Sequence, residues 1–525
     1  MTNIFCIWVI YLKKPSRFIF DAFVLTMSGI LARMIAVSFN VYVSKKISTE
    51  AMGVYQMLMS IYLFGINIAV AGMGLTTIKL VSKEEALENK EKVSLIMKKI
   101  IRYTVTMGSV AMILLMLTSN FLVQNVLNNL VTEKVIYILA VSLPFLSVSY
   151  SLNGYFTAER KVFKSAILQV FDQISKVVIM VIFMNKFLPG DLENACIALI
   201  LGDTVCEVIY CIITVFLYNL DKRKVTYNTK LKIKAENEEK KTAKEIIGIA
   251  FPIAFTACIR SGLNALKQAT IPKSLSKSNM SYKEAISEYG VVTGMAMPII
   301  SFMSVFIQPF SGLLLPQFSE YAAKKDKKRI LYTIDRVFST TICYALCIMG
   351  GLWTFSEELG DMLYNNASVG WYIKMLCPLV VFMYLDSTVD SMLRGLDKQI
   401  GVMICNIVDL IVSISFIYFV VPIMGVKGYI ASMFLSTILN ASISIAILIH
   451  TVHFEFKLFS WVILPTVGVV LAAIVSRVII STLNASYITL AISAGIYVLT
   501  YVCYCILIGK IHKKLNKRKV EYQNI

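Results

Sequence analysis

Fourteen long apolar stretches, separated by short polar loops, run through almost the whole chain. Each stretch is about as long as the roughly 20 residues that a helix needs to cross the hydrocarbon core of a bilayer. The pattern therefore predicts an all-α, polytopic membrane protein. The predicted transmembrane helices cover residues 18–43, 53–80, 99–123, 134–157, 162–187, 194–220, 245–271, 288–316, 331–356, 369–393, 399–421, 426–450, 458–482 and 486–509.

The loops between these stretches alternate between many and few basic residues. With the N-terminus in the cytoplasm, the cytoplasmic segments hold 35 Lys and Arg, and the loops on the opposite side hold 8. Membrane proteins carry such an excess on their cytoplasmic loops. Both termini are therefore predicted to be cytoplasmic. The formal net charge of +19 is explained by topology, so no nucleic-acid partner is expected.

The composition leaves no room for a soluble catalytic domain. The chain is 57% hydrophobic and 16% charged, and its longest polar run covers only about residues 221–244. It has no phosphate-binding Gly-rich loop followed by Lys-Ser/Thr, no HExxH and no nucleophile elbow. Its eleven Cys lie in or beside apolar stretches and it has only three His, a pattern that favours packing over metal binding. We therefore expect no enzyme, no cofactor and no metal site.

The chain also shows signs of an internal duplication. Gly74 and Gly312 lie in similar surroundings 238 residues apart, and Gly154 and Gly395 lie 241 residues apart. A near-constant offset predicts two six-helix units, as in many transporters, with the last two helices outside the repeat. The predicted organisation is an interfacial stub at 1–17, an N-lobe at 18–220, a basic cytoplasmic linker at 221–244, a C-lobe at 245–450, two further helices at 451–510 and a basic cytoplasmic tail at 511–525.

Cations inside the predicted helices are the first candidates for a binding site. A charged side chain near the bilayer centre costs about 2.5–3.5 kcal/mol on insertion scales, so it usually faces a cavity or a partner. Arg33 and Arg260 each lie about 16 residues into the first helix of their half, and Lys267 follows two turns later. We expect the two arginines to face one cavity from opposite lobes, because guanidinium groups bind phosphate oxygens bidentately. Pairing with carboxylates, which would only fix packing, is the alternative.

Carboxylates inside the predicted helices form the second group. Asp172 and Lys176 are spaced i,i+4, which favours a pair that neutralises itself. Asp203 and Glu207 are also one turn apart, and they could bind a cation, share a proton or act as counter-ions for the arginines. The same alternatives, including coupling to Na⁺ or H⁺, stay open for the acidic residues of the second half, which are Asp386, Asp390 and Asp409.

Several short runs resemble one known family. The run that begins Ser48-Thr-Glu-Ala-Met-Gly-Val-Tyr and continues through Gly72-Met-Gly-Leu resembles the first loop and second helix of the stage V sporulation protein B family. That family belongs to the polysaccharide-type branch of the multidrug/oligosaccharidyl-lipid/polysaccharide (MOP) exporter superfamily, alongside the lipid II flippases. Tyr289-Gly-Val-Val-Thr-Gly and Leu315-Pro-Gln-Phe-Ser-Glu look like its eighth helix. Leu393-Arg-Gly-Leu-Asp-Lys looks like the end of its tenth.

The resemblance implies a two-lobe MOP/MATE-like fold with alternating access. Its members are thought to move undecaprenyl-pyrophosphate-linked saccharides across a bacterial plasma membrane for peptidoglycan or other polysaccharide synthesis, in some cases during sporulation. Family members carry cationic residues in the central cavity, and Arg33 and Arg260 are the positions here that could play this part. The expected partners are a lipid-linked saccharide pyrophosphate, membrane lipids and cell-wall synthesis enzymes. A MATE-type, cation-coupled drug antiporter and a non-transporting scaffold for cell-wall enzymes stay open as alternatives.

Overall fold

The structure, a computed structural model, confirms the all-α fold. It describes the chain except residues 1–16, 160, 188–189, 223–234, 483–486 and 524–525. The described residues form helices, and no strand occurs among them. The N-terminal stub predicted at 1–17, apart from its last residue, and half of the linker predicted at 221–244 lie outside the described residues.

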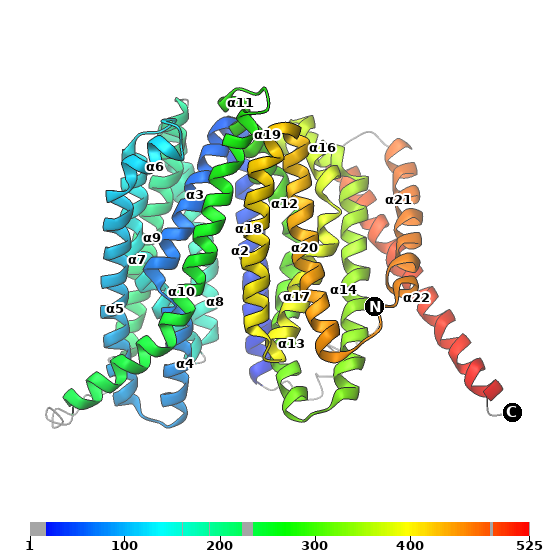
Figure 1. The fold of residues 1–525 in the computed structure, drawn as a ribbon, viewed down its shortest axis with the longest axis horizontal. Helices are drawn as coiled ribbons and strands as arrows, with labels where there is room; N and C mark the ends of the chain where they lie inside the picture. Colours follow the sequence, from blue (N-terminus) through cyan, green and yellow to red (C-terminus); the bar gives the residue numbers. More distant parts are fainter. Residues whose placement is uncertain (1–16, 160, 188–189, 223–234, 483–486, 524–525) are drawn as a thin grey trace. The chain divides into compact units, whose positions relative to one another are not determined.

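The helices follow one another with short connections (Figure 1). In the first half they are α2 (Arg17–Lys46), α3 (Thr49–Val70), α4 (Met73–Ala86), α5 (Lys90–Leu117), α6 (Ser119–Asn125), α7 (Glu133–Ala158), α8 (Val162–Phe187), α9 (Leu192–Lys222) and α10 (Ala235–Ser276). In the second half they are α11 (Tyr282–Gly290), the π-helix η2 (Val291–Ala296), α12 (Met297–Phe302), the 3-10 helix η3 (Met303–Phe306), α13 (Ile307–Ala323), α14 (Lys327–Thr354), α15 (Ser356–Tyr364), α16 (Ala367–Leu376), α17 (Leu379–Gly395), α18 (Gln399–Phe419), α19 (Val421–Met424), α20 (Val426–Val452), the π-helix η4 (Phe459–Ile463), α21 (Leu464–Thr482) and α22 (Tyr487–Gln523).

Polar residues in the loops fix where several helices begin. The Ser48 hydroxyl accepts a hydrogen bond from the Ala51 N–H at 3.1 Å and caps α3. At the start of α11, Ser281 and Glu284 bond to each other's backbone N–H groups and form a capping box. Such caps satisfy N–H groups that the first turn of a helix leaves without partners.

The fourteen predicted membrane helices are confirmed by length and composition. Thirteen helices of the described chain are long and apolar enough to cross a membrane, and the count reaches 14 when one bent pair is taken as a single span. That pair is α16 and α17, which meet at 51° within the stretch predicted at 369–393. Pro378, which stands between them, lacks the N–H that a continuous helix would need. The chain is a multi-pass membrane protein.

The eighth membrane span is the least regular one. It runs through α11, the π-helix η2, α12, the 3-10 helix η3 and α13. Pro298 lies in the first turn of α12, directly after the π-helix. Turns of π or 3-10 geometry inside a long helix often mark functional sites or hinges. The backbone of this span therefore leaves the α-helical pattern on both sides of α12.

The described chain forms two compact units, which divide it at other points than the predicted lobes. Unit 1 holds residues up to Phe20, 295–409 and 433–525, and unit 2 holds 21–294 and 410–432. Helix α10, which the sequence places in the C-lobe, packs on α3 and α11 within unit 2. The chain passes from unit 2 to unit 1 inside η2, between Gly294 and Met295.

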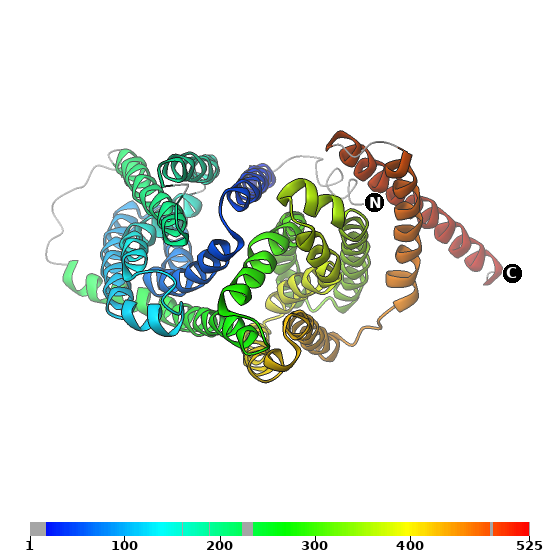
Figure 2. The same cartoon turned by 90° about the horizontal axis from the view of Figure 1, so that it is seen from above.

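In unit 2, close packing between α5, α7 and α9 forms the centre of the helix bundle (Figure 2). A Cβ added at Gly108 of α5 would lie 2.7 Å from the Cα of Pro144 in α7, so only glycine lets the two backbones approach this closely. Beside it, the buried Ser147 hydroxyl of α7 donates to the Thr104 carbonyl of α5 at 2.9 Å. Small residues and interhelical hydrogen bonds are what hold helices together in lipid, where burial of apolar surface gives no driving force.

In unit 1, tyrosines tie the last helix to α14. The Tyr497 and Tyr501 hydroxyls of α22 donate to the Cys347 and Cys343 carbonyls of α14 at 3.0 and 2.9 Å. One turn on, the Cys343 and Cys505 sulfur atoms lie 3.6 Å apart. Because both donors and both acceptors are spaced i,i+4, the bonds repeat along one antiparallel helix interface.

The glycines of the predicted duplication occupy matching positions in the two units. A Cβ added at Gly154 of α7 would lie 2.8 Å from the Gly74 carbonyl oxygen of α4 and 3.1 Å from Thr77. A Cβ added at Gly395 of α17 would lie 2.7 Å from the Leu315 carbonyl oxygen of α13. Thr77 and Leu315 are also 238 residues apart, so each glycine closely approaches the matching helix, although the atoms that it meets differ. This supports the predicted internal repeat.

Candidate functional site

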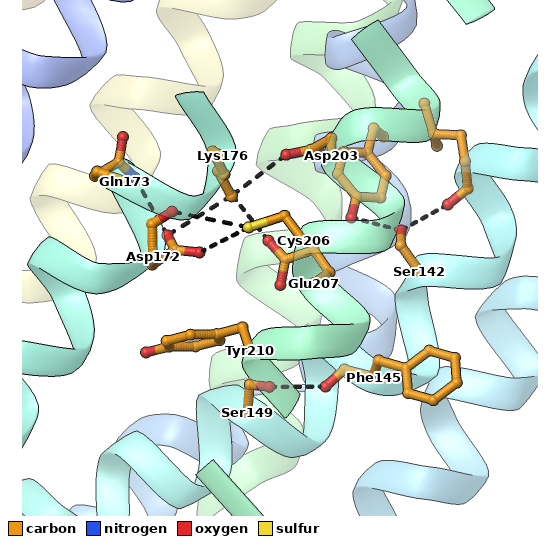
Figure 3. Close-up of polar contacts among 12 residues, drawn as sticks. Ser142, Phe145, Ser149, Asp172, Gln173, Lys176, Asp203, Cys206, Glu207 and Tyr210 are labelled. Carbon is orange, nitrogen blue, oxygen red and sulfur yellow. Dashed lines mark hydrogen bonds and ion pairs between the residues drawn. The ribbon is translucent and has the colours of Figure 1, made fainter. Parts of the chain in front are cut away.

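A lysine surrounded by three carboxylates lies between α8 and α9 in unit 2 (Figure 3). The Lys176 ammonium of α8 lies 2.9 Å from Glu207 and 3.3 Å from Asp203, both on α9. It also lies 3.8 Å from Asp172, one turn earlier on its own helix. The i,i+4 spacing within each helix turns both members of a pair to one face, and the packing of α8 on α9 brings the two faces together.

The predicted self-neutralising pair is therefore the weakest contact of a larger cluster. The Lys176–Asp172 contact is the longest of the three, and the Asp203 and Glu207 side chains are only 12% and 8% exposed. The counter-ion of this acidic pair is Lys176, not either arginine. With all four groups ionised, one ammonium faces three carboxylates and leaves two negative charges in excess. Such a cluster can take up a proton or hold its ammonium between alternative partners, but no three acidic, His or Cys side chains of the described residues are arranged to hold a metal ion.

Neutral polar groups continue this cluster along α7 and α9. The Asn153 amide of α7 donates to the Tyr210 hydroxyl of α9 at 2.8 Å, and Gln173 donates to Asp172 at 3.2 Å. The buried Tyr62 and Ser142 hydroxyls lie 2.6 Å apart. Figure 3 shows Tyr210 one turn below Glu207 on the same helix. Hydrogen-bonded pairs of neutral side chains therefore lie beside the charged cluster inside the apolar bundle of unit 2, and the charge pattern alone did not reveal Asn153 and Tyr210.

The acidic residues of the second half are held differently, by neutral donors from α20. Asn440 donates to Asp386 at 3.0 Å, and Ser444 donates to Asp390 at 3.1 Å, both across from α17. Ser436 donates to Asp409 of α18 at 3.0 Å. The three donors are spaced i,i+4,i+8 and share one face of α20, and this regular spacing of polar residues in an apolar stretch was the available sequence signal. Arg394 approaches Asp390 at 3.8 Å.

The predicted cavity cations lie on α2 and α10. Arg33 is half-buried on α2, Arg260 is exposed on α10, and Lys267 is half-buried two turns later. Among the described residues, neither Arg33 nor Arg260 forms an ion pair with a carboxylate. Both arginines belong to unit 2, so the compact units do not reproduce their expected placement on opposite lobes.

A second ion-pair network lies at the start of α8. Lys161 in the turn before α8 pairs with Glu159 and, at 3.1 Å, with Asp221 at the end of α9, which also accepts from Lys164 at 2.7 Å. Burial by itself lowers the pKa of Lys161, but the hydrogen bonds to Glu159 and Asp221 outweigh it, so the pKa is raised above its ordinary value. This network joins the turn between α7 and α8 to the first turn of α8 and the end of α9. It therefore fixes the start of α8, the helix that carries Lys176.

Comparisons with known proteins confirm the resemblance read from the sequence. Residues 19–260 match the family described as "Polysaccharide biosynthesis protein". The chain is 21% identical to the stage V sporulation protein B of Bacillus subtilis (strain 168) over 522 residues, which cover 96% of this chain and 97% of that protein. It is 19% identical to the sporulation protein YkvU of the same organism over 279 residues, which cover 53% of this chain and 61% of that protein.

Solved structures share the fold. One is a lipid II flippase MurJ in an inward closed conformation, with a TM-score of 0.65 and 12% identity, covering 93% of this chain and 98% of that chain. Another is an inward-facing multidrug resistance MATE family transporter of the MOP superfamily, with a TM-score of 0.61, 12% identity and coverage of 82% and 98%. The predicted MOP/MATE-like fold is confirmed. The chain therefore shares its fold with a flippase and with transporters of the MOP superfamily.

Proposed function

We propose that this protein is a flippase that moves a saccharide linked to undecaprenyl pyrophosphate from the inner to the outer leaflet of a bacterial plasma membrane, with both termini in the cytoplasm. The Polysaccharide biosynthesis protein match supports a saccharide as the cargo, and the likeness to a lipid II flippase supports a lipid-linked one. The two sporulation relatives support a role in spore cortex or cell-wall synthesis, with peptidoglycan precursor as the leading substrate.

The observation that carries the proposal is a contrast between cations inside the membrane spans. Lys176 lies within 4 Å of three carboxylates, whereas Arg33 and Arg260 have no carboxylate partner within the described part of the chain. An arginine inside a span costs at least about 2.5–3.5 kcal/mol and is retained where it meets an anion or a water-filled cavity. A ligand that brings its own negative charge offsets this cost.

A pyrophosphate is such a ligand. Two guanidinium groups can bind its oxygens bidentately, and Lys267 adds a further point charge on the same helix as Arg260. The sugars would cross in the hydrated interior while the polyprenyl chain stays in lipid. The membrane potential, which acts on charge at about 2.3 kcal/mol per 100 mV, is a sufficient driving force for one or two charges.

The test is a leaflet-accessibility assay in liposomes. The full chain is reconstituted with a fluorescent undecaprenyl-pyrophosphate saccharide, and the native protein is compared with Arg33→Gln and Arg260→Gln. A hydrogen bond to a charged group contributes about 1.5–3 kcal/mol, so each variant should slow translocation by about tenfold or more. Arg102→Gln is the matched control, because Arg102 is an exposed arginine of α5 in the same unit. Equal rates for all four proteins would overturn the role of the arginines.

The second candidate is a cation-coupled drug antiporter. The MATE fold neighbour and the carboxylates Asp386, Asp390 and Asp409, which are held by neutral donors, favour it. The same liposomes decide between the two functions when they are loaded with a cationic dye and given a proton or Na⁺ gradient. Dye efflux that follows the gradient, with no movement of the saccharide, would select the antiporter. Liposomes that move neither compound would favour the scaffold alternative.

A further inference from the structure

A pocket of about 490 Å³ opens on the surface of unit 1, between the ends of α18 and α20. Its polar lining comes from Lys398, directly before α18, from His450 and Thr451 at the end of α20, and from Ser442 two turns earlier on α20. Ile443, Ala446 and Ile447 of α20 form its apolar lining. The volume lies within the range of small-molecule sites, roughly 300–1,000 Å³. The pocket shares no residue with either carboxylate cluster.

The lining changes from polar to apolar along the axis of α20. His450 and Thr451 lie in the last turn of the helix, Ala446 and Ile447 lie one turn further in, and Ile443 lies another turn in. At 1.5 Å per residue, the lining from Ile443 to Thr451 extends about 12 Å along the helix. Apart from the single hydroxyl of Ser442 at its inner end, the pocket is therefore polar at the end of α20 and apolar toward the middle of the helix. An amphiphile that stands upright in a leaflet has the same order of groups.

The polar end of the pocket is also the basic end of unit 1. Lys457, in the loop after α20, pairs at 2.6 Å with Asp335 near the start of α14, so the end of α20 and the start of α14 lie together. The turn before α14 and the first turn of that helix carry the basic residues Lys324, Lys325, Lys327, Lys328 and Arg329. Lys398 is exposed and forms no ion pair with a carboxylate in the described part of the chain. A negatively charged headgroup fits this end.

We propose that this pocket binds an anionic glycerophospholipid of the leaflet at the basic end. Lys398 and His450 contact the phosphate, and the upper acyl chain lies on Ile443 and Ala446. The Thr451 hydroxyl already donates to the Ile447 carbonyl at 2.7 Å, and its oxygen can still accept a hydrogen bond from a headgroup hydroxyl. Basic pockets between membrane helices bind acidic lipid headgroups in this way. This proposal does not depend on which substrate the protein transports.

The test is lipid retention by the purified full chain, measured by native mass spectrometry after reconstitution in equal parts phosphatidylglycerol and phosphatidylcholine. The native protein is expected to retain one phosphatidylglycerol in preference to phosphatidylcholine. Lys398→Gln and His450→Gln should each lower this retention about fivefold or more. Lys328→Gln is the matched control, because Lys328 is an exposed lysine at the same end outside the pocket, and it should retain lipid like the native protein.

A second variant separates loss of the site from loss of folding. Ala446→Trp fills the apolar part of the pocket from an exposed position of α20, and it should abolish retention while the protein elutes as the native one does. Retention that is equal in the native, Lys398→Gln and Ala446→Trp proteins would overturn the proposal. Displacement of the bound phospholipid by undecaprenyl phosphate at equal concentration would overturn it too, since the pocket would then belong to the path of a lipid-linked substrate.

Discussion

Replacement of Lys176 by methionine is expected to lower the free energy of unfolding by about 3–5 kcal/mol, the usual cost of leaving a buried ion pair without one partner. Methionine keeps the length and volume of the side chain and removes only the ammonium. The loss is large because three contacts end at once, at 2.9 Å to Glu207, 3.3 Å to Asp203 and 3.8 Å to Asp172. The three carboxylates that remain are at most 18% exposed and repel one another.

The same helix offers a matched control. Lys164 of α8 also contacts a carboxylate, at 2.7 Å from Asp221, but its side chain is 38% exposed. Asp221 keeps Lys161 as a second partner at 3.1 Å. Exposed ion pairs contribute about 0–1 kcal/mol, so Lys164→Met should cost no more than that. The predicted difference between the two lysine variants is therefore about 2–5 kcal/mol.

The assay is reversible unfolding by sodium dodecyl sulfate in mixed micelles, followed by tryptophan fluorescence. A compensated variant, Lys176→Met with Asp203→Asn and Glu207→Gln, removes two of the unpaired charges and should recover at least half of the loss. Equal costs for Lys176→Met and Lys164→Met would refute the argument that burial makes the Lys176 cluster costly to break. A compensated variant that is no more stable than Lys176→Met would refute the argument that charge is the cause.

Two further outcomes follow from contacts described above. Gly395→Ala should destabilise the protein by about 1–3 kcal/mol, because the added Cβ would lie 2.7 Å from a backbone carbonyl oxygen of α13. Gly312→Ala should not destabilise it, because a Cβ added there meets nothing within 4 Å. The same detergent titrations measure both variants, and equal losses of stability would contradict the close approach at Gly395. Lys161 stabilises the fold through its hydrogen bonds to Glu159 and Asp221 and has a raised pKa in the folded state, so its contribution is complete below the unfolded value of about 10.4 and disappears as pH rises through the folded value. The stability difference between the native protein and Lys161→Gln should accordingly shrink as pH rises above about 10.4, and a difference that does not change with rising pH would contradict the assignment.

The membrane spans could be predicted because the bilayer fixes their length and the apolar pattern marks them. The bend between α16 and α17 could be placed only within the stretch 369–393, since one proline allows either a kink or a break. The duplication was predicted from two pairs of glycines, and the structure gives a steric reason for glycine at Gly154 and Gly395 but not at Gly74 and Gly312. The last two spans were expected outside the repeat, but their attachment to α14 through Tyr497 and Tyr501 depends on contacts that no local pattern encodes.

The partners of the charged residues were harder to predict than their positions. The i,i+4 rule placed Asp203 with Glu207 on one face of their helix, but it could not say that Lys176 of the neighbouring helix lies opposite. That depends on how α8 is rotated against α9, which side-chain packing over the whole interface decides. The donors Asn440 and Ser444 were missed because neutral residues carry little cost in a membrane span and so attract less attention than charges.

The π-helix η2 decides how the eighth span responds to the loss of a residue. A π-turn accommodates one residue more than an α-turn does, so loss of a single codon within η2 would let this turn close as an α-turn and would leave the orientation of α12 and α13 almost unchanged. Each residue of an α-helix turns the chain by about 100°, so the same loss within α12 would rotate α13 by about a quarter of a turn. Ser311 of α13 would then face away from Ser387 of α17, which it now meets at 3.2 Å. Single-residue deletions are therefore expected to be tolerated in the loops and within η2 but not in the α-helical parts of this span.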